Sequence, residues 1–305
     1  MNNVVVLLAA YNGMEWIDEQ INSILNQRDV NVKIYISVDV STDDTYYLLK
    51  NKYSLFGKVV LLPYGEKFGA AAPNFYHLFQ EVDVANYDFI ALSDQDDIWL
   101  DDKIISGIKK INQTDSAGYS SNVIAFWSNG KKRLIKKATK QRKYDYLFEG
   151  PGPGCSFILT RKFAMEVKQY FADEKEMLYK IDWHDWAIYA FARSKKYSWY
   201  IDPQSHMFYR QHFANQLGAN SGIKQFLKRA KEIACGYAIN QTLLIIKFLK
   251  FENNHFVKSW INCTRLDFVK LSFFAYECRR RKKDQLLFFL SCIIMAMIRP
   301  IKENK

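Results

Sequence analysis

The chain has 305 residues, enough for one large domain or for a domain with an appendage. Hydrophobic residues make up 49%, charged residues 25% and aromatic residues 16%, a globular composition rich in Phe and Tyr. The net charge of +11 is unevenly placed, with basic blocks at 131–133 and 279–283, and it favours anionic partners. The five cysteines show no CxxC spacing, which argues against a disulfide framework or a zinc site.

The first part of the chain alternates apolar runs of strand length with segments of helical periodicity. Strands are predicted at residues 3–10, 32–38, 59–62 and 89–92. Helices are predicted at residues 16–25, from a capping box at 41–44 to about 53, at 70–80 and at 103–111. This alternation predicts an α/β fold with a mostly parallel central sheet that helices cover on both faces.

The run from Val4 to Ala10 has no basic residue before it and no small-residue cleavage site after it. It is therefore predicted to be the first strand and not a signal peptide. Together with the scattered cysteines, this predicts a cytosolic protein.

An acidic loop with Asp94, Asp96 and Asp97 follows the strand at 89–92 directly. Three carboxylates this close repel one another, and a divalent cation with oxygen ligands compensates that repulsion, above all when a phosphate completes its shell. The alternative is that Asp96 or Asp97 caps the helix at 103–111.

The residues that follow the other strands favour a ligand site over capping. Tyr11 and Asn12 follow the first strand, and Asp39 follows the second. Ligands of parallel sheets bind beyond the carboxyl ends of the strands, so these residues are expected to meet the acidic loop in one crevice. The chain has neither GxGxxG after the first strand nor a P-loop, so metal and side chains would neutralise a phosphate-bearing ligand.

After residue 112 the pattern loosens. A strand is predicted at 123–127, and the basic stretch 131–143 is interpreted as a solvated loop. The glycine-proline run at 150–154 leads into a predicted strand at 156–160; it is either a turn or a place where backbone approaches a ligand closely.

Asp185 lies at the start of a helix whose apolar positions include Trp186. The acid either complements the helix dipole or acts as a base. Further on, Arg210 is suited to a phosphate oxygen, and His212 either completes a metal shell or is structural.

From residue 221 onward the chain is helical, basic and apolar, so we predict two parts, 1–220 and 221–305. The apolar stretch 285–298 is shorter than the ~20 residues that cross a bilayer. With basic residues on both sides, segment 279–299 is suited to an anionic membrane surface. The alternative is a buried terminal helix that packs on the main domain.

With these residues in view, residues 3 to 220 resemble the family-2 glycosyltransferases of the GT-A type, and among them the rhamnosyltransferases of surface-polysaccharide assembly. The resemblance rests on ordered motifs. These are residues 8–13 (LAAYNG), 19–20 with 23–27, 39–43 (DVSTD), 93–99 (SDQDDIW), 184–186 (HDW), and 209–212 (YRQH) with Asn215 and 218–220.

The resemblance implies a role for each matching residue. The nucleotide would lie against Ala10, Tyr11, Asn12, Asp39, Asp94 and Arg210. Asp96 and His212 would hold a divalent cation, Mg²⁺ or Mn²⁺, and Asp185 would deprotonate the acceptor hydroxyl in an inverting displacement. The donor and acceptor sugars would contact Trp99, Gly154, His184 and Trp186.

The resemblance also implies a substrate and a location. The expected reaction is transfer of L-rhamnose from dTDP-rhamnose to a glycan or lipid-linked acceptor, at the inner face of the cell membrane and without nucleic acid as a partner. Val38 and Val40 depart from the family's Asp and Gly, and valine disfavours the positive φ that glycine allows. A UDP-hexose donor is therefore the first alternative.

Two other readings belong to different classes of protein. A haloacid-dehalogenase-like phosphotransferase would carry its acids after the first strand, whereas here they follow the fourth. A non-catalytic basic protein bound to a membrane or to nucleic acid would not need an acidic crevice.

Overall fold

The computed structural model describes residues 1–212 and 236–298. They group into two compact units: unit 1 comprises 1–138 and 151–219, and unit 2 comprises 139–150 and 220–305. Segment 139–150 thus belongs with the C-terminal helices, a grouping that its sequence did not indicate. Each unit is described by itself.

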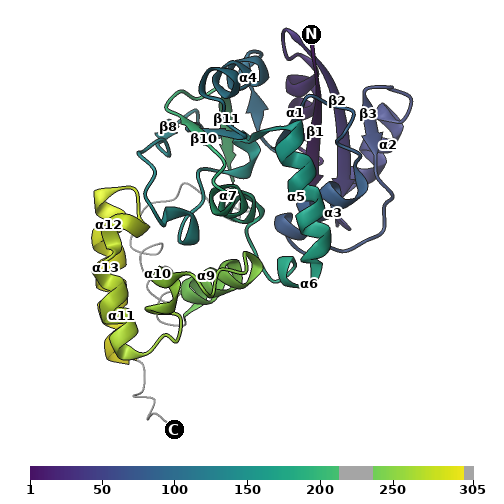
Figure 1. Cartoon of the computed structure of the whole chain (residues 1–305). Helices are drawn as coiled ribbons and strands as arrows, with labels where there is room; N and C mark the ends of the chain where they lie inside the picture. The colour runs from purple at the N-terminus through teal and green to yellow at the C-terminus, as the bar shows by residue number, and fades with distance from the viewer. Residues whose placement is uncertain (213–235, 299–305) are drawn as a thin grey trace. The chain divides into compact units, whose positions relative to one another are not determined.

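Unit 1 is an α/β domain built on a seven-stranded sheet, ordered β10-β6-β9-β4-β1-β2-β3 (Figure 1). The strands β1, β2, β3 and β4 run parallel, and β9 is antiparallel to its neighbours β4 and β6. This confirms the predicted mostly parallel sheet. The bounds are β1 Asn2–Ala10, β2 Val30–Val38, β3 Val59–Leu61, β4 Phe89–Asp94, β6 Gly118–Ser121, β9 Ile158–Thr160 and β10 Trp199–Asp202.

Helices cover both faces of this sheet, so every side chain of the central strand from Val4 to Ala10 is buried. Alternate residues of β1 join a core cluster with apolar residues of α1, α2 and α4, and α3 packs on β1 and against α5 and α7. The bounds are α1 Ile17–Leu25, α2 Thr45–Tyr53, α3 Ala71–Glu81, α4 Lys103–Thr114, α5 Arg161–Asp173, α6 Lys175–Leu178 and α7 His184–Ser194.

A second, four-stranded sheet of unit 1 has the order β5-β11-β7-β8. Its strands are β5 Ile98–Trp99, β7 Val123–Trp127, β8 Lys132–Ile135 and β11 Met207–Gln211. Part of the stretch predicted as a solvated loop is therefore a strand: β8 pairs with β7 at the edge of the sheet, where the Lys132 side chain remains exposed.

Two local predictions need correction. The segment 41–44 is not a capping box, because Asp44 is the N-cap of α2 without a side-chain cap, and Asp43 accepts the Thr45 N–H at 3.0 Å. The strand expected from residue 156 begins at Ile158, because Gly154–Ser156 forms a short 3₁₀ helix.

The described part of unit 2 consists of α-helices and the short 3₁₀ helix Asp145–Leu147. Phe148, from the same segment, contacts an aromatic cluster formed by Phe256, Trp260 and Phe288. None of the described helices is long and apolar enough to cross a membrane. The helices are α9 Tyr237–Phe248, α10 His255–Lys258, α11 Arg265–Ser272, α12 Ala275–Cys278 and α13 Lys282–Ile298.

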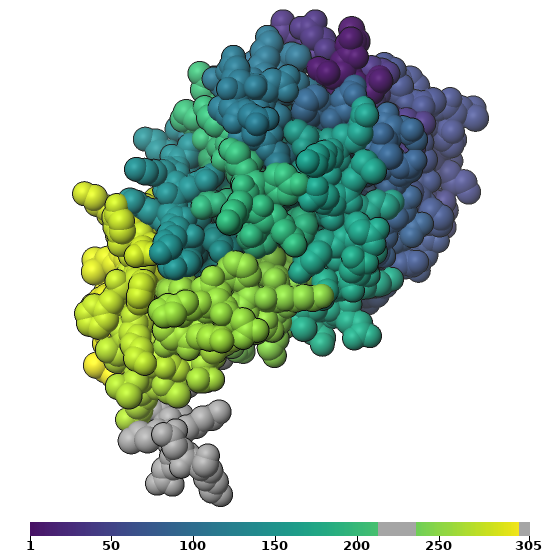
Figure 2. Space-filling model, viewed as in Figure 1, coloured from purple at the N-terminus to yellow at the C-terminus, as the bar shows by residue number. Residues whose placement is uncertain are grey.

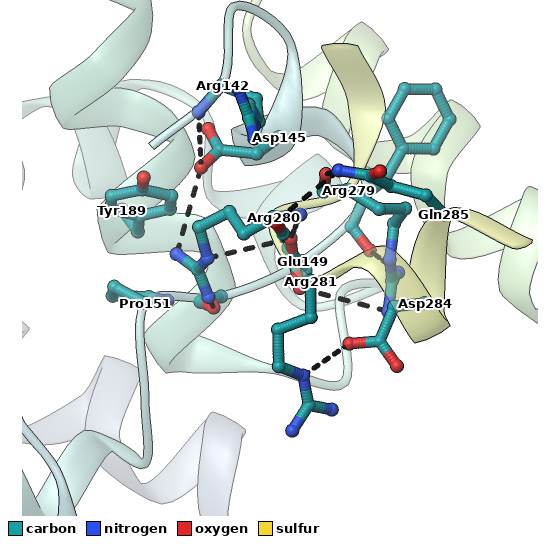
Figure 3. A network of polar contacts seen from close by, with 12 residues as sticks. Arg142, Asp145, Glu149, Pro151, Tyr189, Arg279, Arg280, Arg281, Asp284 and Gln285 are labelled. Atoms are coloured by element: carbon teal, nitrogen blue, oxygen red, sulfur yellow. Dashed lines mark hydrogen bonds and ion pairs between the residues drawn. The ribbon is translucent and has the colours of Figure 1, made fainter. Parts of the chain in front are cut away.

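The basic block of unit 2 is largely an internal network (Figure 3). The Arg280 side chain is 3% exposed, donates to the Gly150 carbonyl at 2.6 Å and forms ion pairs with Asp145 and Glu149. Arg279 donates to the Phe148 carbonyl at 2.8 Å. The prediction that the whole block faces an anionic partner is therefore wrong for Arg279 and Arg280, whose charges hold segment 139–150 inside unit 2.

Candidate active site

Three neighbouring strands of unit 1 end side by side. Ala10, the last residue of β1, pairs with Val38 of β2, and Ala9 pairs with Asp94 of β4. The segments that follow these strands therefore begin at one edge of the sheet, as predicted for a ligand site in a parallel sheet.

The turn after β1 is fixed by hydrogen bonds to two neighbouring segments. The Gln95 side chain bonds to both backbone groups of Tyr11, at 3.3 Å and 3.1 Å. Asn12 takes a positive φ of 48°, and its side chain accepts the Thr42 N–H at 2.8 Å. The Tyr11 side chain is 49% exposed beside this edge, so its ring is available to a planar ligand group.

Asp39 is 3% exposed and holds the loop between β3 and α3. Its two carboxylate oxygens accept the N–H groups of Phe68 and Gly69, at 2.9 Å and 2.8 Å. Val40 is not among the residues with positive φ, so valine in place of glycine leaves this turn unstrained. Each Asp39 oxygen retains a second lone pair for a ligand donor.

The acidic loop does not cap α4, because the N-cap of that helix is Asp102. Burial, followed by the charge of Asp96, raises the pKa of Asp94 to about 7, and the same two causes raise the pKa of Asp97 well above its usual range. Ionised carboxylates are thus costly here without a compensating cation.

Two groups of side chains, each with members of this loop, could hold a cation. The ligand atoms of Asp94, Asp97 and Cys155 all lie within 4.8 Å of one another, but burial raises the pKa of the Cys155 thiol, and a protonated thiol is a poor ligand for Mg²⁺ or Mn²⁺. Asp96 Oδ2 lies 2.6 Å from His212 Nε2. The carboxylates, with His212, therefore fit a divalent cation.

Arg210 holds the acidic loop rather than pointing freely at a ligand. Its Nε donates to the Asp96 carbonyl at 2.8 Å, its backbone N–H donates to Asp97 at 3.2 Å, and its guanidinium forms an ion pair with Glu19. The contact of Glu19 with Arg210 was not predicted, although Glu19 belongs to the motif at residues 19–20. The position of Trp16 was not predicted either; its ring stacks on His212 at a centroid distance of 4.2 Å.

Asp185 lies in the first turn of α7, where its Oδ1 accepts the Trp186 N–H at 2.7 Å. Burial raises the pKa of Asp185 to about 6. The charge of Asp185 contributes to the raised pKa of Asp94, so the two carboxylates lie in the same electrostatic environment. At neutral pH Asp185 is mostly ionised and can accept a proton.

Gly154 and His184 fit against each other. A Cβ on Gly154 would lie 2.2 Å from His184 Nε2, which makes no hydrogen bond in the described part of the chain. The His184 ring stacks on Phe75 at a centroid distance of 3.9 Å, and burial lowers the pKa of His184 to about 3, so the ring is neutral. Because Gly154 has no side chain, its backbone can lie close to another group, and that group is the His184 ring.

The two tryptophans predicted to contact sugar are buried. Trp99 is 3% exposed, and the Nζ of Lys103 lies 3.5 Å from the centroid of its ring. Trp186 is 9% exposed within α7. A buried, covered ring cannot stack on a sugar, so we remove Trp99 from the proposed contacts. The part of the last motif from residue 213 lies outside the described residues.

Comparisons with known proteins agree with this geometry. The model of the glycosyl transferase family 2 matches residues 5–171. The dTDP-rhamnosyl transferase RfbG of Shigella flexneri is 40% identical over 291 residues, which cover 94% of this chain and 99% of RfbG.

The fold is similar to solved structures of S. aureus TarS 1–349. The complex with UDP matches with a TM-score of 0.55 and 13% identity, over 96% of this chain and 88% of that one. The complex with UDP-GlcNAc matches with a TM-score of 0.53 and 12% identity, over 96% and 89%. At this identity the likeness concerns the fold alone.

Proposed function

The chain belongs to glycosyl transferase family 2, and on this basis we propose that it transfers L-rhamnose from dTDP-rhamnose to a glycan or lipid-linked acceptor in surface-polysaccharide synthesis. The observation that carries the proposal is the meeting of three strand ends, where Asp94 and Asp96 lie beside the turn that presents Tyr11. The electrostatic coupling of Asp185 to Asp94 supplies a base at the same site.

The donor is proposed to bind along the strand ends. Tyr11 would lie against the base, Asp39 would accept a hydrogen bond from it, and Asp94 would bind the ribose. Asp96 and His212 would hold Mg²⁺ or Mn²⁺, which stabilises the negative charge of a departing nucleoside diphosphate when it is bound. Trp16 and Arg210 would orient this pair, since Trp16 stacks on His212 and Arg210 holds the Asp96 carbonyl.

The acceptor is proposed to bind on the side of Asp185. The acceptor oxygen attacks the anomeric carbon while its proton passes to an Asp185 carboxylate oxygen, and the bond between that carbon and the diphosphate oxygen breaks. The displacement inverts the anomeric centre and needs no covalent intermediate. The Trp186 N–H, which donates to Asp185 Oδ1 at 2.7 Å, would direct the other oxygen of the carboxylate at the acceptor.

The location proposed for this reaction is the cytosolic face of the cell membrane, where the protein would be peripheral. A UDP-hexose remains the second candidate donor, because the strand-end contacts predict a pyrimidine nucleotide without selecting its sugar. A phosphotransferase of the haloacid-dehalogenase kind is disfavoured, since Ala10 is followed by Tyr11 and Asn12 where such an enzyme needs its acids.

The test has two stages. Thermal unfolding is measured with dTDP-rhamnose and with UDP-hexoses, each with and without Mn²⁺, and the largest stabilisation is expected from dTDP-rhamnose with Mn²⁺. Transfer is then compared in Asp96→Ala and Asp185→Asn, with Asp101→Asn as the control because Asp101 is exposed and pairs with Arg28 on the surface.

Both site variants are expected to lose about a hundredfold or more in kcat, while the control keeps its activity. Asp185→Asn should still be stabilised by the donor, because Asp185 belongs to the acceptor side. Full transfer by Asp96→Ala would refute the cation site, and full transfer by Asp185→Asn would refute the base.

A further inference from the structure

Helices α11 and α12 carry an exposed apolar stripe. Its four side chains are 71%, 36%, 77% and 60% exposed and recur at spacings of three, four and three residues, which places them on one side of a helical path. They are Leu266, Val269, Phe273 and Tyr276. The opposite side of α11 is buried, with Phe268 in the core of unit 2.

A second stripe runs along α13, which packs against α11. Cys292 and Met295 are buried, and Met295 joins Phe268 in the core of unit 2, so one side of this helix packs within unit 2 and the other is exposed. The space-filling view shows the C-terminal helices at the surface (Figure 2). The exposed apolar side chains are Leu286, Leu287, Leu290, Ile294, Met297 and Ile298.

The charges around these stripes have one sign. Among residues 255–298, all the exposed charged residues are lysine or arginine, whereas the acids Asp267, Glu277 and Asp284 are buried or half-buried. Arg281 is paired with Asp284 at 2.6 Å. The exposed cations are Lys258, Arg265, Lys270, Lys282 and Lys283, whereas Arg279 and Arg280 bond to segment 139–150.

We propose that the exposed sides of α11, α12 and α13 form a lipid-binding face that lies flat in the headgroup region of an anionic leaflet. Helix α13 has 17 residues and is about 25 Å long, less than the ~30 Å hydrocarbon core, which favours lying in the interface. A second copy of the chain is a poorer occupant, because two such faces would bring their lysines together. This inference rests on the proposed lipid-linked acceptor.

The test is co-sedimentation of the full chain with vesicles of phosphatidylethanolamine and phosphatidylglycerol, and with vesicles of phosphatidylcholine alone. Binding is expected to the anionic vesicles and to fall with added salt. Phe273→Ser and Leu290→Ser each remove one apolar contact and should weaken binding severalfold. The double variant Lys282→Gln/Lys283→Gln should weaken it roughly tenfold or more at low salt.

A matched control separates this face from non-specific hydrophobic binding. Leu55 is fully exposed in unit 1, so Leu55→Ser should bind vesicles as the parent chain does. Equal binding by Phe273→Ser and Leu55→Ser would overturn the proposal. A concentration-dependent dimer that Phe273→Ser abolishes would assign the face to a second copy and also overturn it.

A soluble, lipid-free acceptor distinguishes failure of this inference from failure of the proposed function. Phe273→Ser is expected to transfer sugar to that acceptor at the parent rate, since it lies outside the catalytic residues. Vesicle binding without any transfer by the parent chain would refute the proposed function alone. Transfer without vesicle binding would refute the lipid-binding face alone.

Discussion

The protonation of Asp185 should control the rate of transfer between pH 5 and 8. Burial raises its pKa from 3.8 to about 6, and a base must be ionised to accept the proton of the acceptor hydroxyl. The rate should therefore fall as the pH falls. About a tenth of a carboxyl with a pKa of 6 is ionised at pH 5, so transfer should be about tenfold slower at pH 5 than at pH 8.

An aspartate with its ordinary pKa would give a different profile, because about nine tenths of it would remain ionised at pH 5. The assay is the initial rate of transfer to a soluble acceptor with donor and Mn²⁺ saturating at every pH. Saturation matters because Asp94, whose pKa is raised to about 7 in the free protein, would otherwise add its own dependence to the profile. A rate that stays constant down to pH 5 would refute Asp185 as the base.

Three further predictions concern stability. Arg280→Met removes the buried cation that pairs with Asp145 and Glu149 and should destabilise unit 2 by about 3–5 kcal/mol. The exposed Arg281→Met should cost at most about 1 kcal/mol. Both effects are measured by hydrogen exchange of segment 139–150. Gly154→Ala should lower the free energy of unfolding by about 1–3 kcal/mol and reduce transfer, because the new Cβ collides with the His184 ring. Gly57→Ala is the control: its Cβ meets open space, so the melting temperature should not change. The raised pKa of Asp94 means that its protonated form is favoured in the folded protein. The contribution of Asp94 to stability is therefore full below its unfolded pKa near 4 and is lost as the pH rises through about 7. Without metal the melting temperature should fall over this pH range, and Mn²⁺ should oppose the fall.

Local sequence patterns predicted the strands and helices of the first part of unit 1. The apolar run of β1 and the helical spacing of α1 are properties of neighbouring residues, so a single sequence reveals them. The meeting of the ends of β1, β2 and β4 at one edge of the sheet was also predictable, because parallel strands fix where their ends lie.

Features that depend on distant partners could not be predicted in this way. Residues 139–143 were predicted as part of a solvated loop, and no contact was predicted for the residues that follow, but Phe148 packs with residues more than a hundred positions away. Arg280 looked like a surface cation for the same reason. The contacts of Arg210 with Asp96 and Glu19 likewise depend on the tertiary fold. All three residues belong to motifs recognised in the sequence, but the sequence does not show that they meet.

The assignment of residues 139–150 to the C-terminal helices sets an order of events during synthesis. This segment leaves the ribosome about 130 residues before Arg280, on the order of ten seconds at ordinary elongation rates. During that interval Asp145 lacks its ion pair with Arg280, and Phe148 lacks its contact with Trp260, so the nascent enzyme cannot complete its fold from the front alone. A chain that stops early would expose the aromatic side chain of Phe148, and exposed apolar surface is a feature that chaperones and proteases recognise in unfinished proteins.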